Sequence, residues 1–303
     1  EKNNIPADAF ITGFVFRNQL RKEVRPLMEG FAQFQKENPK VKSYLLLHTY
    51  WSEPGGWGLT RFIEELGIKK ESILTTHVCS HCHNYEVKSY AGDLVNCKFC
   101  GSEKTVTTCQ VNNGITEKEL NEVYNLMDCY AHGMNAGGLE IPICEALYSE
   151  LPLATVGYSS GEMFTDQAFV YPIKFTYTVQ HQTQFLRAVP QSDSICKFLT
   201  KINNMSAEER ENLGKRCREW AINKFNVNVI GKQWEDYIDS LPDHNWDFKF
   251  ESDIKNVNAD IRDIEENEND DFFIKECYKR ILNMEISNNQ DSGFLHWQQF
   301  LNN

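Results

Sequence analysis

The chain has 303 residues, enough for two modest domains, and its 41% hydrophobic and 12% aromatic content suits a globular core. Its formal net charge of −12 argues against broad electrostatic binding to nucleic acid or to an anionic membrane. No apolar run approaches the ~20 residues that a membrane-spanning helix needs. We expect no signal peptide, and the start at Glu1 without a Met suggests a processed product or a piece of a longer protein.

Strand-like and helix-like patterns alternate over the first 240 residues. Apolar, β-rich runs stand at residues 10–16, 44–48, 72–78, 105–111 and 151–156, and in a short run that ends at His132. Helices are indicated by apolar periodicity at 24–34 and 59–66, by capping boxes at Thr116–Glu119 and Ser206–Glu209, and by the pattern at 227–240. This alternation predicts an α/β fold with a parallel sheet covered on both faces.

We expect one such domain over residues 1–242, with an insertion at 79–104. Residues 243–270 are polar and acidic, which is typical of a linker. An apolar helical stripe that begins at Phe272, and a short helix around Trp297, predict a small helical hairpin over 271–303.

Ten cysteines are many for a cytosolic protein. Six of them stand in apolar or helical surroundings: Cys109, Cys129, Cys144, Cys196, Cys217 and Cys277. Buried free thiols in a reducing compartment explain these six more simply than a secreted disulfide framework does. We therefore expect a cytoplasmic location.

The insertion carries two CxxC knuckles, formed by Cys79, Cys82, Cys97 and Cys100. Four thiolates at this spacing close a tetrahedral Zn²⁺ site, which makes His81 and His83 unnecessary as ligands. A closed shell leaves no open position for a substrate. The predicted zinc is therefore structural, and it stabilises an insertion too small for its own core.

The zinc ribbon also admits nucleic-acid binding as an interpretation. Its three lysines are balanced by three carboxylates, at Lys88, Lys98, Lys104, Glu86, Asp93 and Glu103. A nearly neutral ribbon makes contact with DNA or RNA the less favoured reading. Because the insertion leaves the sheet just after a strand, we expect it near the rim of the ligand crevice.

A Gly-rich turn separates the strand that ends at His132 from the next helix. Gly133, Gly137 and Gly138 are followed by two carboxylates, Glu140 and Glu145. Glycine lets the backbone approach a ligand closely, and a helix N-terminus presents free N–H groups to a phosphate. The stretch therefore predicts a nucleotide crevice.

The run from Asn113 to Asp128, followed by GGLEIPICEALYSELPLATV, resembles the C-terminal, donor-binding domain of retaining GT-B glycosyltransferases. It looks most like family 4, which carries a motif of two Glu residues separated by seven others. The stretch from Phe16 to Lys22 and the following strand agree with this. The resemblance covers about residues 8–240 without the insertion. It implies a Rossmann-like parallel sheet and a UDP- or GDP-linked sugar as the donor.

The resemblance also implies roles for individual residues. Arg17 and Lys22 match the basic pair that binds the donor diphosphate and stabilises it as it leaves. Glu145 matches the motif Glu that holds the ribose hydroxyls. Further donor contacts are implied at Gly13, Gly137, Gly138, Leu139 and Glu140, and the candidate catalytic residues are Arg17, Lys22 and Glu140.

One position departs from the motif. The first Glu, expected eight residues before Glu145, falls on Gly137, which puts contact with the donor sugar in question. Glu140 follows three residues later and has two interpretations, a sugar ligand and a carboxylate that caps a helix N-terminus. Arg17, Lys22 and Glu145 can also be read as ordinary surface charges. His48 and His132 fit structural histidines, and Ser159, Ser160 and Glu162 are candidates to line the same crevice.

The expected function is transfer of a sugar, with retention, from a nucleotide-diphosphate sugar to an unknown acceptor. A GT-B enzyme holds its acceptor mainly in a second Rossmann-like domain, so we expect a longer protein or a partner chain to supply that half. Two alternatives stay open. One is a non-catalytic interaction or structural module on a degenerate glycosyltransferase domain. The other is a glycosyltransferase whose ribbon guides transfer onto modified DNA bases.

Overall fold

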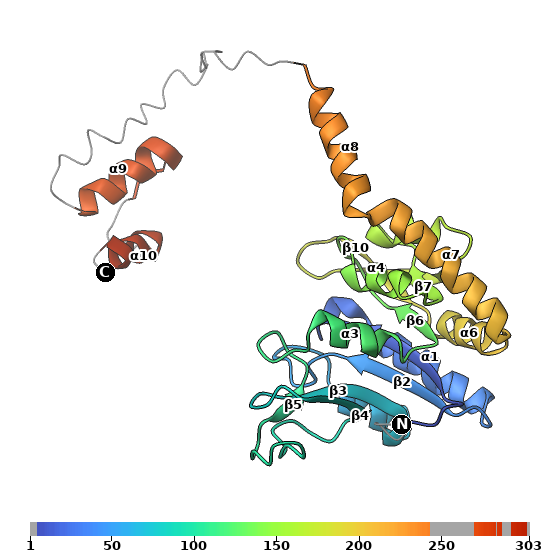
Figure 1. The fold of residues 1–303 in the computed structure, drawn as a ribbon. Helices are drawn as coiled ribbons and strands as arrows, with labels where there is room; N and C mark the ends of the chain where they lie inside the picture. The colour runs from blue at the N-terminus through green and yellow to red at the C-terminus, as the bar shows by residue number, and fades with distance from the viewer. Residues whose placement is uncertain (1–4, 243–269, 283, 287–291, 302–303) are drawn as a thin grey trace. The chain divides into compact units, whose positions relative to one another are not determined.

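The computed structural model describes residues 5–242, 270–282, 284–286 and 292–301 (Figure 1). The chain divides into two compact units, Glu1–Asp239 and Ser240–Asn303. The predicted linker lies outside the described residues except for Asp270. The predicted domain limits stay a prediction.

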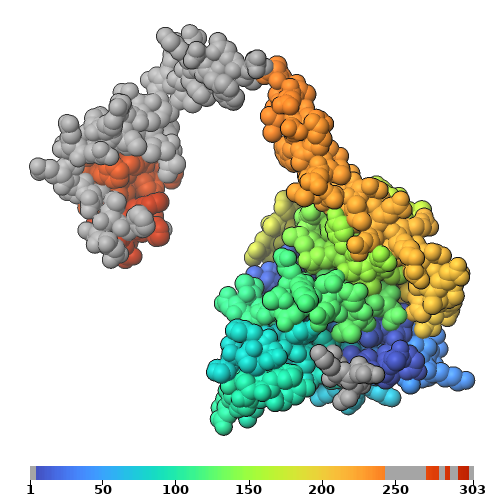
Figure 2. All heavy atoms as spheres, viewed as in Figure 1, coloured from blue at the N-terminus to red at the C-terminus, as the bar shows by residue number. Residues whose placement is uncertain are grey.

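The first unit is built on a mostly parallel sheet with the strand order β4-β3-β2-β1-β6-β7-β8. Its strands are β1 (Phe10–Val15), β2 (Ser43–His48), β3 (Ile73–Cys79), β4 (Tyr85–Ser89), β5 (Val106–Thr108), β6 (Cys129–His132), β7 (Leu153–Val156) and β8 (Tyr171–Ile173). The predicted α/β architecture is therefore confirmed. The sequence patterns missed that β4 and β5 both run antiparallel to β3, because the knuckle residues hide the strand pattern of the insertion. In Figure 2 the turquoise atoms of this region form one edge of the unit.

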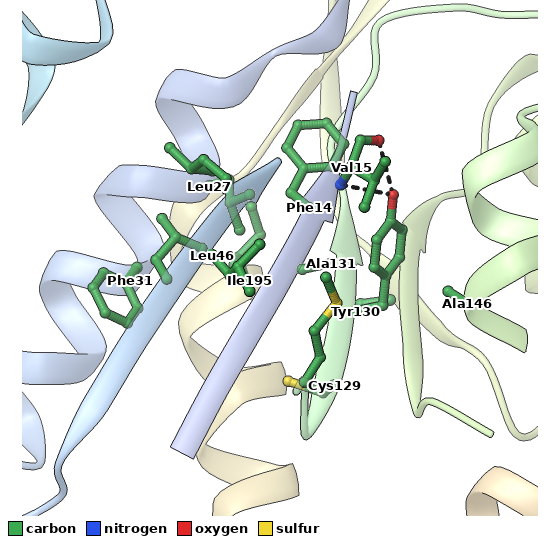
Figure 3. Close-up of a cluster of buried hydrophobic side chains, with 14 of the residues drawn as sticks. Phe14, Val15, Leu27, Phe31, Leu46, Cys129, Tyr130, Ala131, Ala146 and Ile195 are labelled. Atoms are coloured by element: carbon green, nitrogen blue, oxygen red, sulfur yellow. Dashed lines mark hydrogen bonds between the residues drawn. The ribbon is translucent and has the colours of Figure 1, made fainter. Parts of the chain in front are cut away.

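Helices cover both faces of the sheet. The helices of this unit are α1 (Val24–Glu37), α2 (Leu59–Glu65), α3 (Glu117–Tyr124), α4 (Ile141–Tyr148), α5 (Glu162–Thr165), α6 (Ser192–Asn203), α7 (Ala207–Phe225) and α8 (Val227–Asp239). Helix α8 has no buried residue and extends beyond α7, away from the sheet (Figure 1). The capping boxes at Thr116 and Ser206 are both formed. Helix α1 packs closely on α6, because a Cβ at Gly30 would lie only 2.7 Å from the carbonyl oxygen of Ser192. Figure 3 shows Leu27 of α1 and Ile195 of α6 meeting in the core beside β1 and β2.

The order of the strands reverses between β1 and β6. Strands β2 and β3 extend the sheet on one side of β1, and β6 then returns to its other side. These two strands pair only through Thr12 with Cys129 and Gly13 with Tyr130. Beyond that point the Tyr130 hydroxyl accepts from the N–H of Val15 at 3.1 Å and donates to its carbonyl at 3.0 Å (Figure 3). We call this join the β1–β6 seam. Ligands of open α/β sheets bind outside the carboxyl ends of strands at such a reversal.

A β-hairpin that the sequence patterns missed follows β8. It pairs β9 (Phe175–Val179) with β10 (Leu186–Pro190), and the Tyr158 hydroxyl donates to the carbonyl of Leu186 at 2.6 Å. No helix in the described part of the chain is long and apolar enough to cross a membrane.

The second unit contains α9 (Asp270–Leu282) and α10 (Ser292–Leu301), where two helices were expected. Ile274 and Phe294 are buried, and the side-chain amide of Gln298 donates to Asp271 at 2.8 Å.

Candidate functional site

Charged side chains from two loops meet at the carboxyl edge of the sheet, beside the β1–β6 seam. Lys22 follows β1 and forms an ion pair with Glu140, which precedes α4. Nη1 of Arg21 lies 3.2 Å from Oε1 of Glu140, and Nε2 of His132 lies 3.4 Å from Oε2. These four residues are the Lys22–Glu140 cluster. Lys22 is only 4% exposed and Glu140 only 5%, so their charges are largely shielded from water.

The protonation states of the cluster follow from this burial. Burial raises the pKa of Glu140, but the hydrogen bonds and charges of His132 and Lys22 outweigh that effect and lower the pKa to about 2. Burial lowers the pKa of Lys22 and of His132, and contact with Glu140 opposes both shifts. At neutral pH the cluster therefore contains an ionised carboxylate and a neutral imidazole.

Backbone contacts hold the two loops together. The N–H of Asn135 donates to the carbonyl of Arg21 at 2.9 Å, and its side-chain amide donates to Glu23 at 3.1 Å. Glu23 has a left-handed backbone with φ 42°, and a Cβ at Gly133 would lie 2.9 Å from its carbonyl oxygen. Sequence reasoning missed Arg21, Glu23 and Asn135. The one sequence feature that indicated a close approach of these two loops was Gly133.

The two candidate carboxylates, Glu140 and Glu145, are held differently. Glu140 occupies the N-cap position of α4, yet its side chain makes no capping hydrogen bond and turns to Lys22 instead. Glu145 is half-buried and accepts a hydrogen bond of 2.7 Å from the hydroxyl of Tyr124. Tyr124 is 2% exposed, so this contact fixes the orientation of Glu145.

Arg17, the other cation of the predicted pair, lies at the surface and binds Glu53, with Nη2 2.6 Å from Oε1. The loop that carries Glu53 is fixed to the loop after β1, because the side-chain amide of Asn18 bonds both the N–H and the carbonyl of Trp57 at 2.9 Å. Beside Arg17 lies an open-sided pocket of about 220 Å³. The buried Thr49 hydroxyl in its lining has no hydrogen-bond partner among the described residues.

Of the remaining predicted site residues, some are packed inside the fold and others are exposed to solvent. Gly13 lies inside β1, where a Cβ would meet Sδ of Met127 at 1.9 Å, so its missing side chain serves packing. Gly138 and Leu139 are exposed, and no atom lies within 4 Å of a Cβ built at Gly138. Ser159 does reach the Gly-rich turn, since its hydroxyl donates to the carbonyl of Gly137 at 2.9 Å.

The four cysteines of the insertion converge, with all four sulfur atoms within 4.8 Å of one another. Sγ of Cys79 lies 3.8 Å from that of Cys100, and Sγ of Cys82 lies 3.7 Å from that of Cys97. A tetrahedron with Zn–S bonds of about 2.3 Å has edges of about 3.8 Å. The group therefore has the size of a four-thiolate metal site, and the cluster can hold a metal ion.

Solved structures show where this fold recurs. The chain is similar to sucrose-phosphate synthase from Thermosynechococcus elongatus, with a TM-score of 0.51 and 16% identity, and to the apo form of OtsA, with 0.50 and 11%. Both matches cover 78% of this chain, but only 46% and 45% of the solved chains. A match to WaaG, a glycosyltransferase involved in lipopolysaccharide biosynthesis, has a TM-score of 0.49 and 13% identity, over 79% of this chain and 50% of WaaG.

The chain thus spans about half the length of these proteins or less. No protein-family model matches it, and no curated protein does. At identities this low the similarity concerns the fold. The expected resemblance in architecture to GT-B glycosyltransferases is confirmed.

Proposed function

We propose that the chain is the donor-binding half of a retaining glycosyltransferase, which transfers a sugar from a nucleotide-diphosphate sugar to an acceptor. The observation that carries this proposal is the Lys22–Glu140 cluster. Cations from the loop after β1 and a carboxylate from the loop after β6 converge at the point where the strand order reverses. Open α/β sheets bind nucleotides at that point.

Each part of the site has a role in the proposal. Lys22 and Arg17 bind the donor diphosphate, and Arg21 adds a third cation. At the start of α4, Pro142 has no N–H, and that of Ile143 donates to the carbonyl of Glu140. The N–H of Ile141 is therefore the one that binds a phosphate oxygen, and the exposed backbone at Gly138 leaves room for it. Glu145, oriented by Tyr124, accepts hydrogen bonds from the ribose hydroxyls. The pocket beside Arg17 takes the base.

A structural Zn²⁺ in the four-cysteine cluster completes the proposal. The ribbon contacts the loop after β2, because Tyr90 stacks on Trp51 at 4.1 Å between ring centroids and Asp93 accepts a hydrogen bond from Ser52. That same loop presents Glu53 to Arg17. Zinc would therefore support the donor site through packing rather than through chemistry. Its thiolates need a reducing compartment, which fits a cytoplasmic location.

Calorimetry with the full chain tests donor binding. Titration with UDP-glucose and with GDP-mannose should show saturable binding of one of them. Arg17→Ala and Glu145→Gln should each weaken that binding about 10- to 100-fold, since each removes a hydrogen bond to or from a charged group. The matched control is Arg61→Ala, which removes an exposed Arg–Glu pair on α2. Failure of a folded chain to bind either sugar nucleotide, or UDP or GDP alone, contradicts the proposal.

A second candidate function is a non-catalytic binding module. The observation in its favour is that Glu140 already neutralises Lys22 inside the cluster. This module would bind a nucleotide sugar without turning it over when an acceptor half is added. Release of the nucleotide diphosphate in such a reconstituted assay would exclude it.

A further inference from the structure

Gly137 and Glu140 share one small volume of the crevice. A Cβ built on Gly137 would lie 2.2 Å from Oε1 of Glu140 and 3.1 Å from its Cδ. No real side chain tolerates such a distance. The Glu140 carboxylate therefore fills the space into which a side chain at position 137 would project.

The backbone explains how a residue three positions later reaches this space. Glu140 has φ −87° and ψ 92°, the extended conformation of an N-cap residue, and it makes no capping hydrogen bond. Its side chain is instead drawn back over the Gly-rich turn by Lys22 and Arg21. Gly137 is the position that makes this return possible, because any Cβ there would displace the carboxylate.

We propose that the donor-site carboxylate has moved along the chain, so that Glu140 supplies from position 140 the group that the sequence motif would supply from position 137. This inference rests on the proposed function. In it, Glu140 accepts hydrogen bonds from hydroxyl groups of the donor sugar and is a substrate-contacting residue. Gly137 has no side chain, which leaves space for the Glu140 carboxylate.

Lys22 can serve both the carboxylate and a diphosphate. An ammonium group carries three N–H donors, and Glu140 is its only side-chain partner among the described residues. Two donors are left for phosphate oxygens. The ion pair therefore places the sugar-binding carboxylate next to the phosphate-binding cation, as a sugar diphosphate requires.

The test moves the carboxylate back. Glu140→Gly removes it at a position where Gly is a tolerated N-cap residue, and Gly137→Glu/Glu140→Gly restores it from the other position. The matched control, Gly137→Gln/Glu140→Gly, has the same shape without the charge. Each full-length variant is titrated by calorimetry with UDP-glucose and with UDP, or with GDP-mannose and GDP if the wild type prefers guanine. Thermal unfolding is recorded in parallel.

Glu140→Gly should bind the sugar nucleotide about 10- to 100-fold more weakly while binding of the bare nucleotide changes far less, because one charge-assisted contact to the sugar is lost. The Gly137→Glu double variant should recover most of this affinity and most of the lost melting temperature, and the Gln control should recover neither. A Glu double variant that behaves like the Gln control overturns the proposal. So does a sugar nucleotide that binds Glu140→Gly as tightly as it binds the wild type.

Failure of the proposed function gives a different result. In that case the wild type binds no nucleotide or sugar nucleotide at all. The melting temperatures then still decide whether positions 137 and 140 reach the same place. A Glu double variant no more stable than its Gln control rejects the shared position.

Discussion

Two clusters of chemically matched side chains lie in this molecule, and they differ in how the sequence encodes them. The four cysteines come from two knuckles within 22 residues, and their spacing alone indicates a metal site. The Lys22–Glu140 cluster joins residues 118 positions apart, and only the strand order brings them together. A cluster of residues that are close in the sequence can thus be predicted from the sequence alone. A cluster of residues that the fold brings together can be predicted only when the strand order of the sheet is known.

The two clusters also differ in their expected response to the loss of one member. In the proposed zinc site one ion joins all four cysteines, so losing one ligand should weaken the whole site. The Lys22–Glu140 cluster depends on mutual neutralisation in a buried place, so losing one charge exposes the other to the cost of burial. Four measurements, from the largest expected effect to the smallest, can sharpen or break this comparison.

Removal of the metal should have the largest effect. Structural zinc contributes an apparent ~10–16 kcal/mol in small zinc domains at neutral pH, so a strong chelator should unfold the ribbon and abolish amide protection in β4. Cys100→Ser should lower bound zinc below one ion per chain, as measured by metal analysis and hydrogen exchange. Cys144→Ser, outside the cluster, should leave zinc unchanged. Full amide protection of β4 in the stripped protein would show that the ribbon needs no metal.

Breaking the buried ion pair should have the next largest effect. Glu140→Gln should cost about 3–5 kcal/mol of unfolding free energy in urea, because Lys22 stays buried without a counter-charge. The double variant Lys22→Met/Glu140→Leu should recover much of that loss. Glu211→Gln, which breaks an exposed pair on α7, is the control and should change stability by less than about 0.5 kcal/mol. A loss below about 1 kcal/mol for Glu140→Gln would mean that water reaches the pair.

As the pH is lowered, the free energy of unfolding should fall over two ranges that overlap near pH 4. His77 is 1% exposed, and burial lowers its pKa to about 4. Burial also lowers the pKa of His48 to about 4. At each of these two histidines the unfolded chain binds one more proton than the folded chain between pH 6.5 and 4, which destabilises the fold by about 3 kcal/mol per histidine as the pH falls through that range. Glu140, with a pKa of about 2, adds its loss only between about pH 4.5 and 2.

Urea unfolding at several pH values checks this order. His77→Phe should reduce the slope in the upper window by about half, because His48 keeps its contribution, and the exposed His181→Gln should leave the slope unchanged. An unchanged slope in His77→Phe would assign the upper window to other groups. The lower window should shrink in Glu140→Gln but not disappear, because the paired carboxylates of Glu65 and Glu86 also have lowered pKa values.

The smallest effect should come from Arg17. Its ion pair with Glu53 is exposed on the Arg side, so Arg17→Ala should change the unfolding free energy by only about 0.2–1 kcal/mol. Urea unfolding beside Glu140→Gln gives the contrast directly. A loss of unfolding free energy as large as that of Glu140→Gln would mean that the Arg17–Glu53 pair stabilises the fold as a buried ion pair does.

Much of the fold could be predicted because local patterns determine it. The capping boxes at Thr116 and Ser206 formed as predicted, since each depends on residues three positions apart. The β9–β10 hairpin was missed although Phe175, Tyr177 and Val179 alternate with two threonines, a pattern that is typical of a strand. Strand β4 was missed because the knuckles on either side dominate the pattern.

The candidate site was predictable in its parts and not in its contacts. Lys22 and Glu140 were both identified, but the pairing between them depends on the β1–β6 seam. Arg21 and Tyr124 carry no motif, and they matter only because the fold places them beside Glu140 and Glu145. The return of Glu140 over Gly137 depends on backbone angles that no spacing rule specifies.

The thin β1–β6 seam has a mechanical consequence. Besides the two residue pairs and the Tyr130 hydroxyl, the hydrogen bonds of Ile11 with Asp128 and of Arg21 with Asn135 join the two halves of the sheet there. Lys22 belongs to the half of the sheet that contains β1, and Glu140 belongs to the half that contains β6. Their ion pair therefore also links the two halves across the β1–β6 seam. Any ligand that contacts both loops adds a second link between the two halves. Ligand binding in the crevice would therefore make the centre of the sheet more rigid.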